Sequence, residues 1–510
     1  MAEVRESPVE LERIRICGDI VIPRMVSGLW QLAGGHDEKV SIDTAARVME
    51  NMVDSGFDCF DMADHYGDAE LVVGRFRATC PHNVVAFTKW CPAETGIKSF
   101  EAAERAVDLA LQRMGQKQID LLQYHIWDYS DDTYWHNFAH LRVMQKQGKI
   151  KHIGVTNVDA AHLKLLVDTG FEIATNQVSC SVLDQRFVRG GLASLCQKYK
   201  VGILAYGTLL GGFLSEKWLD QPEPEDINSL NWSLRKYLRF IRAAGGWTPF
   251  QGILRALSAI ARNHGVSIAA VATRYVLDIP AVSAVIVGCR LTAESVGYTA
   301  RNLQAFSFAL SDDDQALIKN AQQALQDIPG DCGDEYRRHP YLTAAGDLSH
   351  HVADSKVTQD VTLRNSIAMG ARIEFSTGSP WEPIAGYCRA VRTDSYIYVS
   401  GTTANSPAIV GVSVLGGSSA SSQTVAILDM ISRAVKALGG ALSDVVRTRV
   451  IIRNETDCEE VSRVHGWVFQ CEGVRPSNML FVASPIGDEY LVEIEAEARV
   501  GCAATLRLSS

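Results

Sequence analysis

The sequence has no run that approaches the roughly 20 apolar residues of a membrane-spanning helix. Its amino terminus, MAEVRESPVELERIRI, contains no apolar core of the kind that a signal peptide carries. The 12 cysteines are scattered singly, without a C-x-x-C pair or a grouping with histidine at the spacing of a zinc site. We therefore expect a cytoplasmic protein with reduced thiols, no membrane partner and no metal.

An excess of positive charge is also absent. The 510 residues carry a formal net charge of −10 at pH 7, with a pI near 5.8, so no electrostatic case exists for nucleic acid or an anionic membrane as the main partner. A local cationic site can still bind an anionic cofactor. Hydrophobic residues make up 47% of the chain and charged residues 21%, as in ordinary globular proteins, and the length allows several domains.

No G-x-G-x-x-G motif follows a strand and opens a helix, so a Rossmann nucleotide-binding fold is excluded. From residue 26 to about residue 302, short apolar runs instead alternate with helical runs. This pattern predicts an α/β fold, a (β/α)8 TIM barrel, preceded by a small hairpin over 13–21 that closes the barrel floor. The predicted barrel strands are 26–30, 57–63, 84–90, 120–126, 152–157, 175–181, 202–209 and 283–289.

Four unlike polar residues, Asp61, Tyr66, Lys89 and His125, lie at or just past the ends of successive predicted strands. The carboxyl ends of barrel strands converge on one mouth, where catalytic groups collect. Taken singly, each residue has a structural alternative. Asp61 and Lys89 would form an ion pair, Tyr66 would be an interface aromatic and His125 a hydrogen-bonded histidine. Four such groups in order favour an active site.

The segments FDMADHYG, FTKW and LLQYHIWD resemble the signature segments of the aldo-keto reductase superfamily, over residues 13 to about 302. The resemblance implies that Asp61, Tyr66, Lys89 and His125 form a catalytic tetrad. Reduction of a carbonyl by hydride leaves an alkoxide that an acid must protonate, and free tyrosine is too weak an acid at pH 7. A neighbouring ammonium stabilises the phenolate, an aspartate keeps that ammonium charged, and a histidine orients the carbonyl oxygen.

The same resemblance implies a nicotinamide cofactor at the barrel mouth. GVTN, NQVS and AYGTLLGGFLSEK match segments around the carboxamide, the ring and the pyrophosphate, and IVGCRLTAESVGY matches the adenosine segment. Arg290 is a candidate partner for a 2′-phosphate, which favours NADP (NADPH) over NAD. Glu294 and Tyr298 replace the family's glutamine and asparagine, which leaves the adenine contacts open. The implied cofactor residues are Thr156, Asn157, Gln177, Tyr206, Gly207, Thr208, Leu209, Lys217, Gly288 and Arg290.

Aromatic residues near the mouth are candidates to line the substrate pocket: Trp30, Trp90 and Trp127, with Tyr124. Aromatic walls suit apolar or aromatic carbonyl compounds, but these residues also suit a core and name no substrate. The long segment 218–247 is interpreted as either a lid or a solvated insertion.

The composition changes after a serine-capped acidic helix, SDDDQALIKNAQQALQDI. Residues 329–369 are polar and have no sustained period, so we expect a tail and linker after a barrel domain over 1–328. His339, His350 and His351 lie in this segment without a fourth ligand at a suitable spacing, and we interpret them as solvated.

Strands in the last part of the chain run adjacent or are separated by a single helix, which predicts an α+β domain with one mixed sheet over 370–510. IAGYCRAV, YIYVSG, DVVRTRVIIRN, VRPSNMLFVASP and LVEIEAEARV resemble segments of the RidA (YjgF) family, which has a chorismate-mutase-like fold. The resemblance implies a homotrimer with clefts between subunits, in which active members hydrolyse enamines and imines to ketones.

One position departs from this second family. Deaminating members carry an arginine that pairs with the substrate carboxylate, and its position falls on Asn478 here. Tyr387 and Glu493 match cleft positions, and Arg389 is a candidate to supply the missing charge. We therefore expect the domain to serve trimerisation or ligand binding. Imine deamination that feeds a carbonyl compound to the barrel is the alternative.

The sequence thus predicts a reversible NADP(H)-dependent oxidoreductase that reduces an aldehyde or ketone to an alcohol, an aldo-keto reductase fused to a RidA-like domain. Two alternatives stay open. One is a bifunctional imine deaminase and carbonyl reductase, and the other is a cofactor-sensing regulatory or scaffold protein with slow turnover. The expected partners are a small carbonyl substrate and further copies of the chain.

Overall fold

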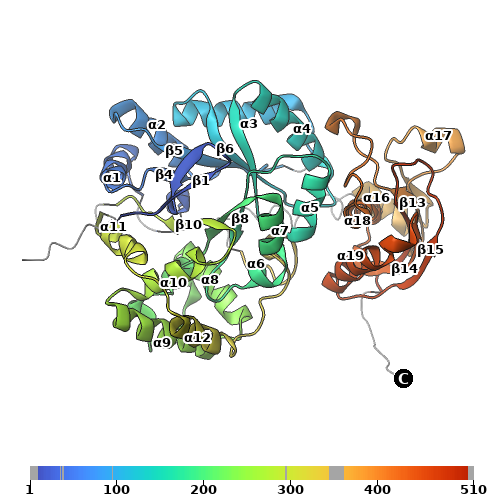
Figure 1. Cartoon of the computed structure of the whole chain (residues 1–510). Helices are drawn as coiled ribbons and strands as arrows, with labels where there is room; N and C mark the ends of the chain where they lie inside the picture. Colours follow the sequence, from blue (N-terminus) through green and yellow to red (C-terminus); the bar gives the residue numbers. More distant parts are fainter. Residues whose placement is uncertain are drawn as a thin grey trace, which may run out of the picture.

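The structure, a computed structural model, describes residues 10–34, 36, 39–94, 96–292, 296–343 and 361–502. Figure 1 shows two folded parts side by side, a large barrel in blue to yellow and a smaller C-terminal domain in orange to red. Glu294, His350 and His351 lie outside the described residues. Within the described ranges, none of the helices combines the length and the hydropathy that a bilayer crossing requires.

Eight parallel strands close into a barrel in the order β10-β3-β4-β5-β6-β7-β8-β9, which confirms the predicted TIM barrel. The antiparallel hairpin β1–β2 precedes the first barrel strand, close to the predicted position. The strands are β1 (Arg13–Ile16), β2 (Ile20–Pro23), β3 (Met25–Gly28), β4 (Cys59–Asp61), β5 (Val85–Trp90), β6 (Ile119–His125), β7 (Ile150–Thr156), β8 (Thr175–Ser179), β9 (Gly202–Tyr206) and β10 (Val282–Gly288).

Helices surround the barrel, and local sequence explains their ends. In α3 the Ser99 hydroxyl accepts a hydrogen bond from the Ala102 amide, and Gly115 ends the helix in the left-handed conformation at φ 63°. The barrel helices are α1 (Ile42–Asp54), α2 (Ala69–Thr79), α3 (Phe100–Met114), α4 (Thr133–Lys146), α5 (Ala160–Asp168), α6 (Arg186–Arg189), α7 (Leu192–Tyr199), α8 (Trp232–Ala243), α9 (Trp247–His264), α10 (Ile268–Leu277), α11 (Val296–Leu303) and α12 (Asp312–Gln322).

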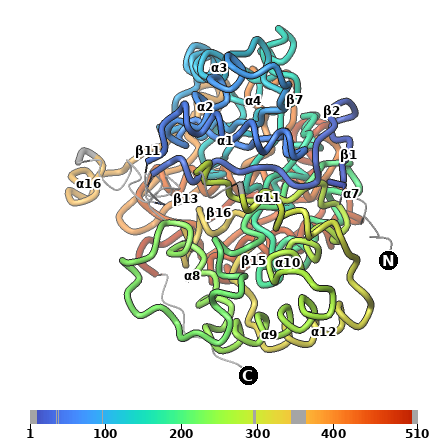
Figure 2. Tube along the Cα trace, turned by 90° about the vertical axis from the view of Figure 1, so that its left-hand side faces the viewer, coloured from blue at the N-terminus to red at the C-terminus, as the bar shows by residue number. Residues whose placement is uncertain are grey.

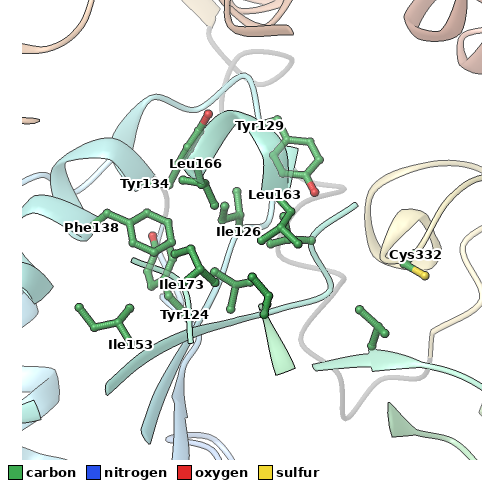
Figure 3. Close-up of a cluster of buried hydrophobic side chains, with 14 of the residues drawn as sticks. Tyr124, Ile126, Tyr129, Tyr134, Phe138, Ile153, Leu163, Leu166, Ile173 and Cys332 are labelled. Atoms are coloured by element: carbon green, nitrogen blue, oxygen red, sulfur yellow. The ribbon is translucent and has the colours of Figure 1, made fainter. Parts of the chain in front are cut away.

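A cluster of buried apolar side chains packs around the end of strand β6 (Figure 3). The ring centroids of Tyr124 and Phe138 lie 5.2 Å apart, and Phe138 also packs on Phe171. The amide of Asn137 donates to the Tyr124 hydroxyl at 2.8 Å, so the polar end of this buried ring is satisfied. This packing fixes the end of β6, where His125 lies.

The C-terminal domain is one mixed sheet with two long helices, as predicted. The strands follow the order β11-β12-β13-β16-β14-β15, with β14 and β15 parallel and the other pairs antiparallel. Even positions of β16 are buried and its glutamates alternate with them, as expected for a sheet covered on one face. The elements are β11 (Ile373–Phe375), β12 (Ala390–Thr393), β13 (Tyr396–Thr403), β14 (Val445–Ile452), β15 (Ser477–Val482), β16 (Val492–Arg499), α16 (Val361–Ala368), α17 (Trp381–Ala385), α18 (Ala420–Ala437) and α19 (Cys458–Cys471).

The segment that follows α12 packs on the barrel, although its composition predicted a tail and linker. It contains α13 (Asp334–Arg337), in which Glu335 and Tyr336 are buried. The Glu335 carboxylate pairs with Arg186 at 2.7 Å, and Arg186 also pairs with Asp184 at 2.8 Å. We call residues 328–343 the strap, because its contacts hold it against the carboxyl ends of the barrel strands.

The two domains meet along helices α5 and α18, and the contacts are largely polar. His162 Nε2 lies 3.1 Å from Asp429 Oδ2, and the Lys436 ammonium lies 2.9 Å from Asp128 Oδ2. The Ser422 hydroxyl donates to Asp168 at 2.6 Å. In Figure 2, which is viewed from the side opposite the C-terminal domain, the barrel lies in front and strands β13, β15 and β16 lie behind it.

Candidate active site at the barrel mouth

A cavity of about 960 Å³ opens at the carboxyl ends of the barrel strands. All four residues of the predicted tetrad, Asp61, Tyr66, Lys89 and His125, line it. They come from the ends of β4, β5 and β6 and from the loop after β4, because parallel strands deliver their last residues to the same mouth.

Asp61 and Lys89 form a buried ion pair. Lys89 Nζ lies 2.5 Å from Asp61 Oδ2 and also donates to the carbonyl of Met62 at 2.7 Å. Asp61 Oδ1 accepts hydrogen bonds from Gln123 at 2.9 Å and from Gln177 at 2.8 Å. With the two side chains only 3% and 4% exposed, these bonds offset the cost of burying the charges.

Tyr66 lies beside this ion pair. The Lys89 ammonium is 5.0 Å from the centroid of the Tyr66 ring, and the His65 ring packs edge-on against the same tyrosine at 4.8 Å. The hydroxyl of a tyrosine beside a fixed ammonium is a better proton donor than a free tyrosine, because the positive charge stabilises the phenolate.

His125 is buried, and neither of its ring nitrogens has a hydrogen-bond partner among the described residues. Its ring packs on Trp127 with centroids 3.9 Å apart. Burial, reinforced by the nearby Arg337 guanidinium and weaker cationic neighbours, holds the pKa of His125 well below its ordinary value. The imidazole is therefore neutral, and one of its nitrogens can donate to an oxygen placed in the cavity.

All ten predicted cofactor residues also line the cavity. They are Thr156, Asn157, Gln177, Tyr206, Gly207, Thr208, Leu209, Lys217, Gly288 and Arg290. Asn157 adopts a left-handed conformation at φ 58°, and its side-chain oxygen accepts from the Tyr206 hydroxyl at 2.7 Å. Gly207, at φ 74°, lies so close to the Tyr237 ring that a Cβ would come within 2.7 Å of its hydroxyl.

The aromatic residues predicted for the substrate pocket divide into two groups. Trp30 and Trp127 line the cavity. Trp90 does not, because its ring turns into the core and packs edge-on against Tyr124 at 5.3 Å. Strand β5 ends at Trp90, and alternate residues of a strand face opposite sides, so Lys89 points to the mouth and Trp90 away from it.

Several residues of the site escaped the sequence analysis, among them Gln123, Lys236 and Tyr336. Lys236 and Tyr336 line the cavity, and the Lys236 ammonium donates to the Tyr336 hydroxyl at 2.8 Å. Lys236 lies on α8, inside the segment interpreted as a lid or solvated insertion. Asn231 caps this helix and its apolar residues follow a helical period, a signal that predicts a packed helix.

One group at the mouth has the residue types of a metal site. Ligand atoms of Asp64, His65 and Cys91 lie within 4.8 Å of one another. However, Asp64 already pairs with His65 Nδ1 at 2.9 Å and accepts from the Cys91 amide at 3.0 Å. These contacts tie the loop that carries Tyr66 to the end of β5, a role that needs no metal.

The residues predicted for the C-terminal cleft lie on two faces of the sheet. Arg389 donates to the carbonyl of Gly401 at 2.7 Å and lies 3.4 Å from the Tyr387 hydroxyl. Burial raises the pKa of Glu493, and the nearby Arg389 opposes this effect. Asn478 instead donates to the Thr448 hydroxyl at 2.9 Å, on the face that α19 covers. Within one chain, Asn478 is therefore separated from the other three.

Comparison with known proteins decides the family of the barrel. Residues 24–323 match the profile of the aldo/keto reductase family, which covers more than half of the chain. The chain belongs to the aldo/keto reductase family. Residues 377–500 match a second family, described as endoribonuclease L-PSP, which supports the RidA-like resemblance of the C-terminal domain. This aldo/keto reductase is therefore a fusion of two families.

Individual relatives resemble different parts of this aldo/keto reductase. The NADH-specific methylglyoxal reductase of Escherichia coli is 24% identical over 338 residues, which are 60% of this chain and 97% of that protein. Flagellar radial spoke protein 5 of Chlamydomonas reinhardtii is 36% identical over 135 residues, but this match spans only 25% of that protein and 26% of this chain. The structure of a glycerol dehydrogenase from Gluconobacter oxydans covers 62% of this chain and 97% of its own, at 22% identity and a TM-score of 0.50, a likeness in fold.

Proposed function

We propose that this aldo/keto reductase reduces an aldehyde or ketone to an alcohol with NAD(P)H, reversibly. The observation that carries the proposal is the neutral, buried His125, whose ring nitrogens have no partner among the described residues, beside Tyr66 and the Asp61–Lys89 pair. A carbonyl oxygen between His125 and Tyr66 would satisfy the imidazole and receive the tyrosine proton. A bound nicotinamide cofactor supplies the hydride.

Buried polar atoms in the cavity fit a bound cofactor and substrate. Trp30 Nε1 and Gln31 Oε1 have no hydrogen-bond partner among the described residues, and both residues line the cavity. Buried polar groups are rarely left unpaired in proteins, so these atoms favour a polar ligand at the mouth. Tyr206 lines the same space, and its aromatic ring suits a stacked nicotinamide ring.

We infer a preference for NADPH from Arg290, which lies just past the end of β10 and lines the cavity. A guanidinium binds a 2′-phosphate well, and this group distinguishes NADPH from NADH. One relative is named as NADH-specific, so both cofactors need to be measured. Arg290→Met is expected to weaken NADPH binding by about tenfold and NADH binding by less than twofold.

The proposal is tested by stopped-flow absorbance of pre-bound NADPH or NADH mixed with a panel of aldehydes and ketones. A carbonyl reductase oxidises the cofactor in a burst faster than the background rate with at least one of these compounds. A protein that binds either cofactor tightly but gives no burst with any compound would instead be a cofactor sensor, the alternative reading.

We also propose that the C-terminal domain joins three copies of the chain. Among the described residues, no helix covers one face of its sheet, and this face presents exposed apolar residues from β13 and β15, among them Tyr398, Met479 and Phe481. Such faces mark protein interfaces, and the RidA-like resemblance favours a trimer. Met479→Asp with Phe481→Asp should give a smaller species in sedimentation velocity. Leu109→Asp, at an equally exposed residue of α3, should not.

A further inference from the structure

The strap holds the ends of two catalytic strands through one arginine. Arg337 donates to the carbonyl of Ile126 at 2.9 Å and to the carbonyl of Asn157 at 2.5 Å. Ile126 directly follows His125, and Asn157 directly follows the end of β7. Since these carbonyls directly follow two different strands, a single planar guanidinium fixes the spacing between the carbonyl-orienting histidine and a predicted cofactor residue.

The strap backbone also approaches Asn157 directly. A Cβ on Gly333, which has φ 87°, would lie 2.0 Å from the carbonyl oxygen of Asn157, a distance that no side chain allows. Asn157 adopts the left-handed conformation, which is uncommon for a residue with a side chain. Its backbone N–H donates to the backbone carbonyl of Gln177 at 2.8 Å, so contacts from three directions hold this conformation.

The same arginine is connected to the C-terminal domain. The Arg337 guanidinium lies 4.3 Å from the centroid of the Tyr129 ring. That ring stacks face to face on His162, with centroids 3.3 Å apart and planes 5° apart. His162 in turn contacts Asp429 of the C-terminal domain at 3.1 Å. The next strap residue, Arg338, pairs with Glu472, which directly follows α19, at 2.7 Å.

Arg337 also sets the electrostatics of His125. Burial is the larger cause of the low pKa of His125, and the Arg337 charge is the next. The other groups that lower the pKa of His125 are His65, Lys236 and Lys89, whereas Asp159, Asp334 and Glu335 act on Arg337 itself. Removing Arg337 therefore raises the pKa of His125 and loosens the two carbonyls at once.

We propose that Arg337 is a positioning residue of the barrel active site, and that the C-terminal domain acts on cofactor binding and turnover through the strap. This proposal rests on the proposed reductase function. Arg337 touches neither cofactor nor substrate in this scheme. It acts by fixing the backbone after His125 and at Asn157, and the second domain stabilises it through Tyr129, His162 and Arg338.

The test compares Arg337→Met and Arg337→Lys with wild type in the full-length protein. Arg337→Met should weaken NADPH binding, followed by fluorescence, by about tenfold. It should also move the acid limb of the pH profile of kcat/KM to higher pH, because His125 becomes easier to protonate. Arg337→Lys should restore the pH profile but not the affinity, since an ammonium keeps the charge and cannot bond both carbonyls in one plane.

The link to the C-terminal domain is tested by Asp429→Asn, with Glu459→Gln as the matched control. Both changes remove one carboxylate from the C-terminal domain, but Glu459 is exposed and pairs only with Arg463 of its own helix among the described residues. Asp429→Asn should weaken NADPH binding about threefold, and Glu459→Gln should leave it unchanged.

Two results would overturn the inference: an Arg337→Met protein with wild-type affinity and pH profile, or an Asp429→Asn protein that matches Glu459→Gln. Circular dichroism and thermal unfolding identify variants that fail to fold, and for these Arg337→Lys and Gly333→Ala, which crowds Asn157 without changing charge, replace Arg337→Met. A wild-type protein without cofactor binding or carbonyl reduction refutes the proposed function itself, which is a separate outcome.

Discussion

The barrel and the C-terminal domain bring polar side chains together by different geometric rules. In the parallel barrel, the carboxyl ends of the strands converge on one mouth, so the inward-pointing Asp61 and Gln177 meet although 116 positions separate them. In the mixed sheet, the face of a side chain depends on its position along the strand. Thr448 and Ile451 of β14 are three residues apart, so their neighbours Asn478 and Glu493 lie on opposite faces.

This difference explains why strand order goes further toward placing the barrel residues together than the residues of the C-terminal cleft. In the barrel, the order of the strands, with the alternation of side chains along each strand, places Asp61, Lys89 and His125 in one cavity. Gln123 escaped prediction because a glutamine in an apolar strand carries no recognisable motif, although its position on β6 places it in the same mouth. For the C-terminal cleft, the register of the strands also matters, and it cannot be read from motif order.

The strap was the largest part of the fold that the sequence did not predict. Its glycines and charged residues give it the composition of a solvated linker, and no local periodicity distinguishes an ordered strap from such a linker. Long-range ion pairs and hydrogen bonds hold the strap in place, such as those of Arg186 with Glu335 and of Arg337 with Asn157. Their partners lie about 150 and 180 residues earlier in the chain, beyond the reach of any local pattern.

The largest expected effect tests whether carbonyl reduction takes place in the barrel and not in the C-terminal domain. Tyr66→Phe removes the proposed acid without changing the shape of the cavity, so the single-turnover rate of carbonyl reduction should fall by about a thousandfold or more. NADPH affinity should stay within about twofold of wild type. Glu493→Gln, the matched change of an acidic group in the C-terminal domain, should leave reduction intact. Equal losses in both variants would contradict the assignment of catalysis to the barrel.

The next largest effect is on the free energy of unfolding, and it compares a fully buried acid with a half-buried one. Asp61→Asn leaves the Lys89 ammonium buried without its counter-charge, so the free energy of unfolding should fall by about 3 to 5 kcal/mol. Glu493→Gln alters a half-buried carboxyl and should cost under about 1 kcal/mol. Urea unfolding followed by circular dichroism measures both. A small loss in Asp61→Asn would mean that the Met62 carbonyl, which also accepts from the ammonium, is enough to stabilise the buried lysine.

The interface between the domains should respond to pH. Burial opposes the charge on His162, but Asp159 and Asp429 outweigh it and raise the pKa of His162 to about 9. The ordinary pKa of histidine is near 6.5. The protonated His162 therefore stabilises the folded protein fully below about pH 6.5, and this stabilisation is lost as the pH rises through about 9. The contribution of His162 to the free energy of unfolding that is lost over this range is on the order of 3 kcal/mol.

His162→Gln should therefore remove most of the fall in stability between pH 6.5 and pH 9 while retaining a polar side chain at the interface. Thermal unfolding of wild type and His162→Gln across this pH range gives the slope of stability against pH for each protein. The difference between the two slopes cancels the contribution of the other titrating groups. The same slope in both proteins would show that His162 does not carry the pH dependence.

The smallest expected effect concerns the position that departs from the RidA family. Asn478 is exposed and donates one hydrogen bond to the Thr448 hydroxyl, so Asn478→Ala should lower the free energy of unfolding by about 1 kcal/mol. A double-mutant cycle with Thr448→Val should give a coupling of similar size, because the two changes break the same bond. Carbonyl reduction should stay within about twofold of wild type, since this bond lies on the helix-covered face of the sheet. A loss of reduction in Asn478→Ala, without a matching loss in Thr448→Val, would mean that the amide acts on the barrel rather than only within its own sheet.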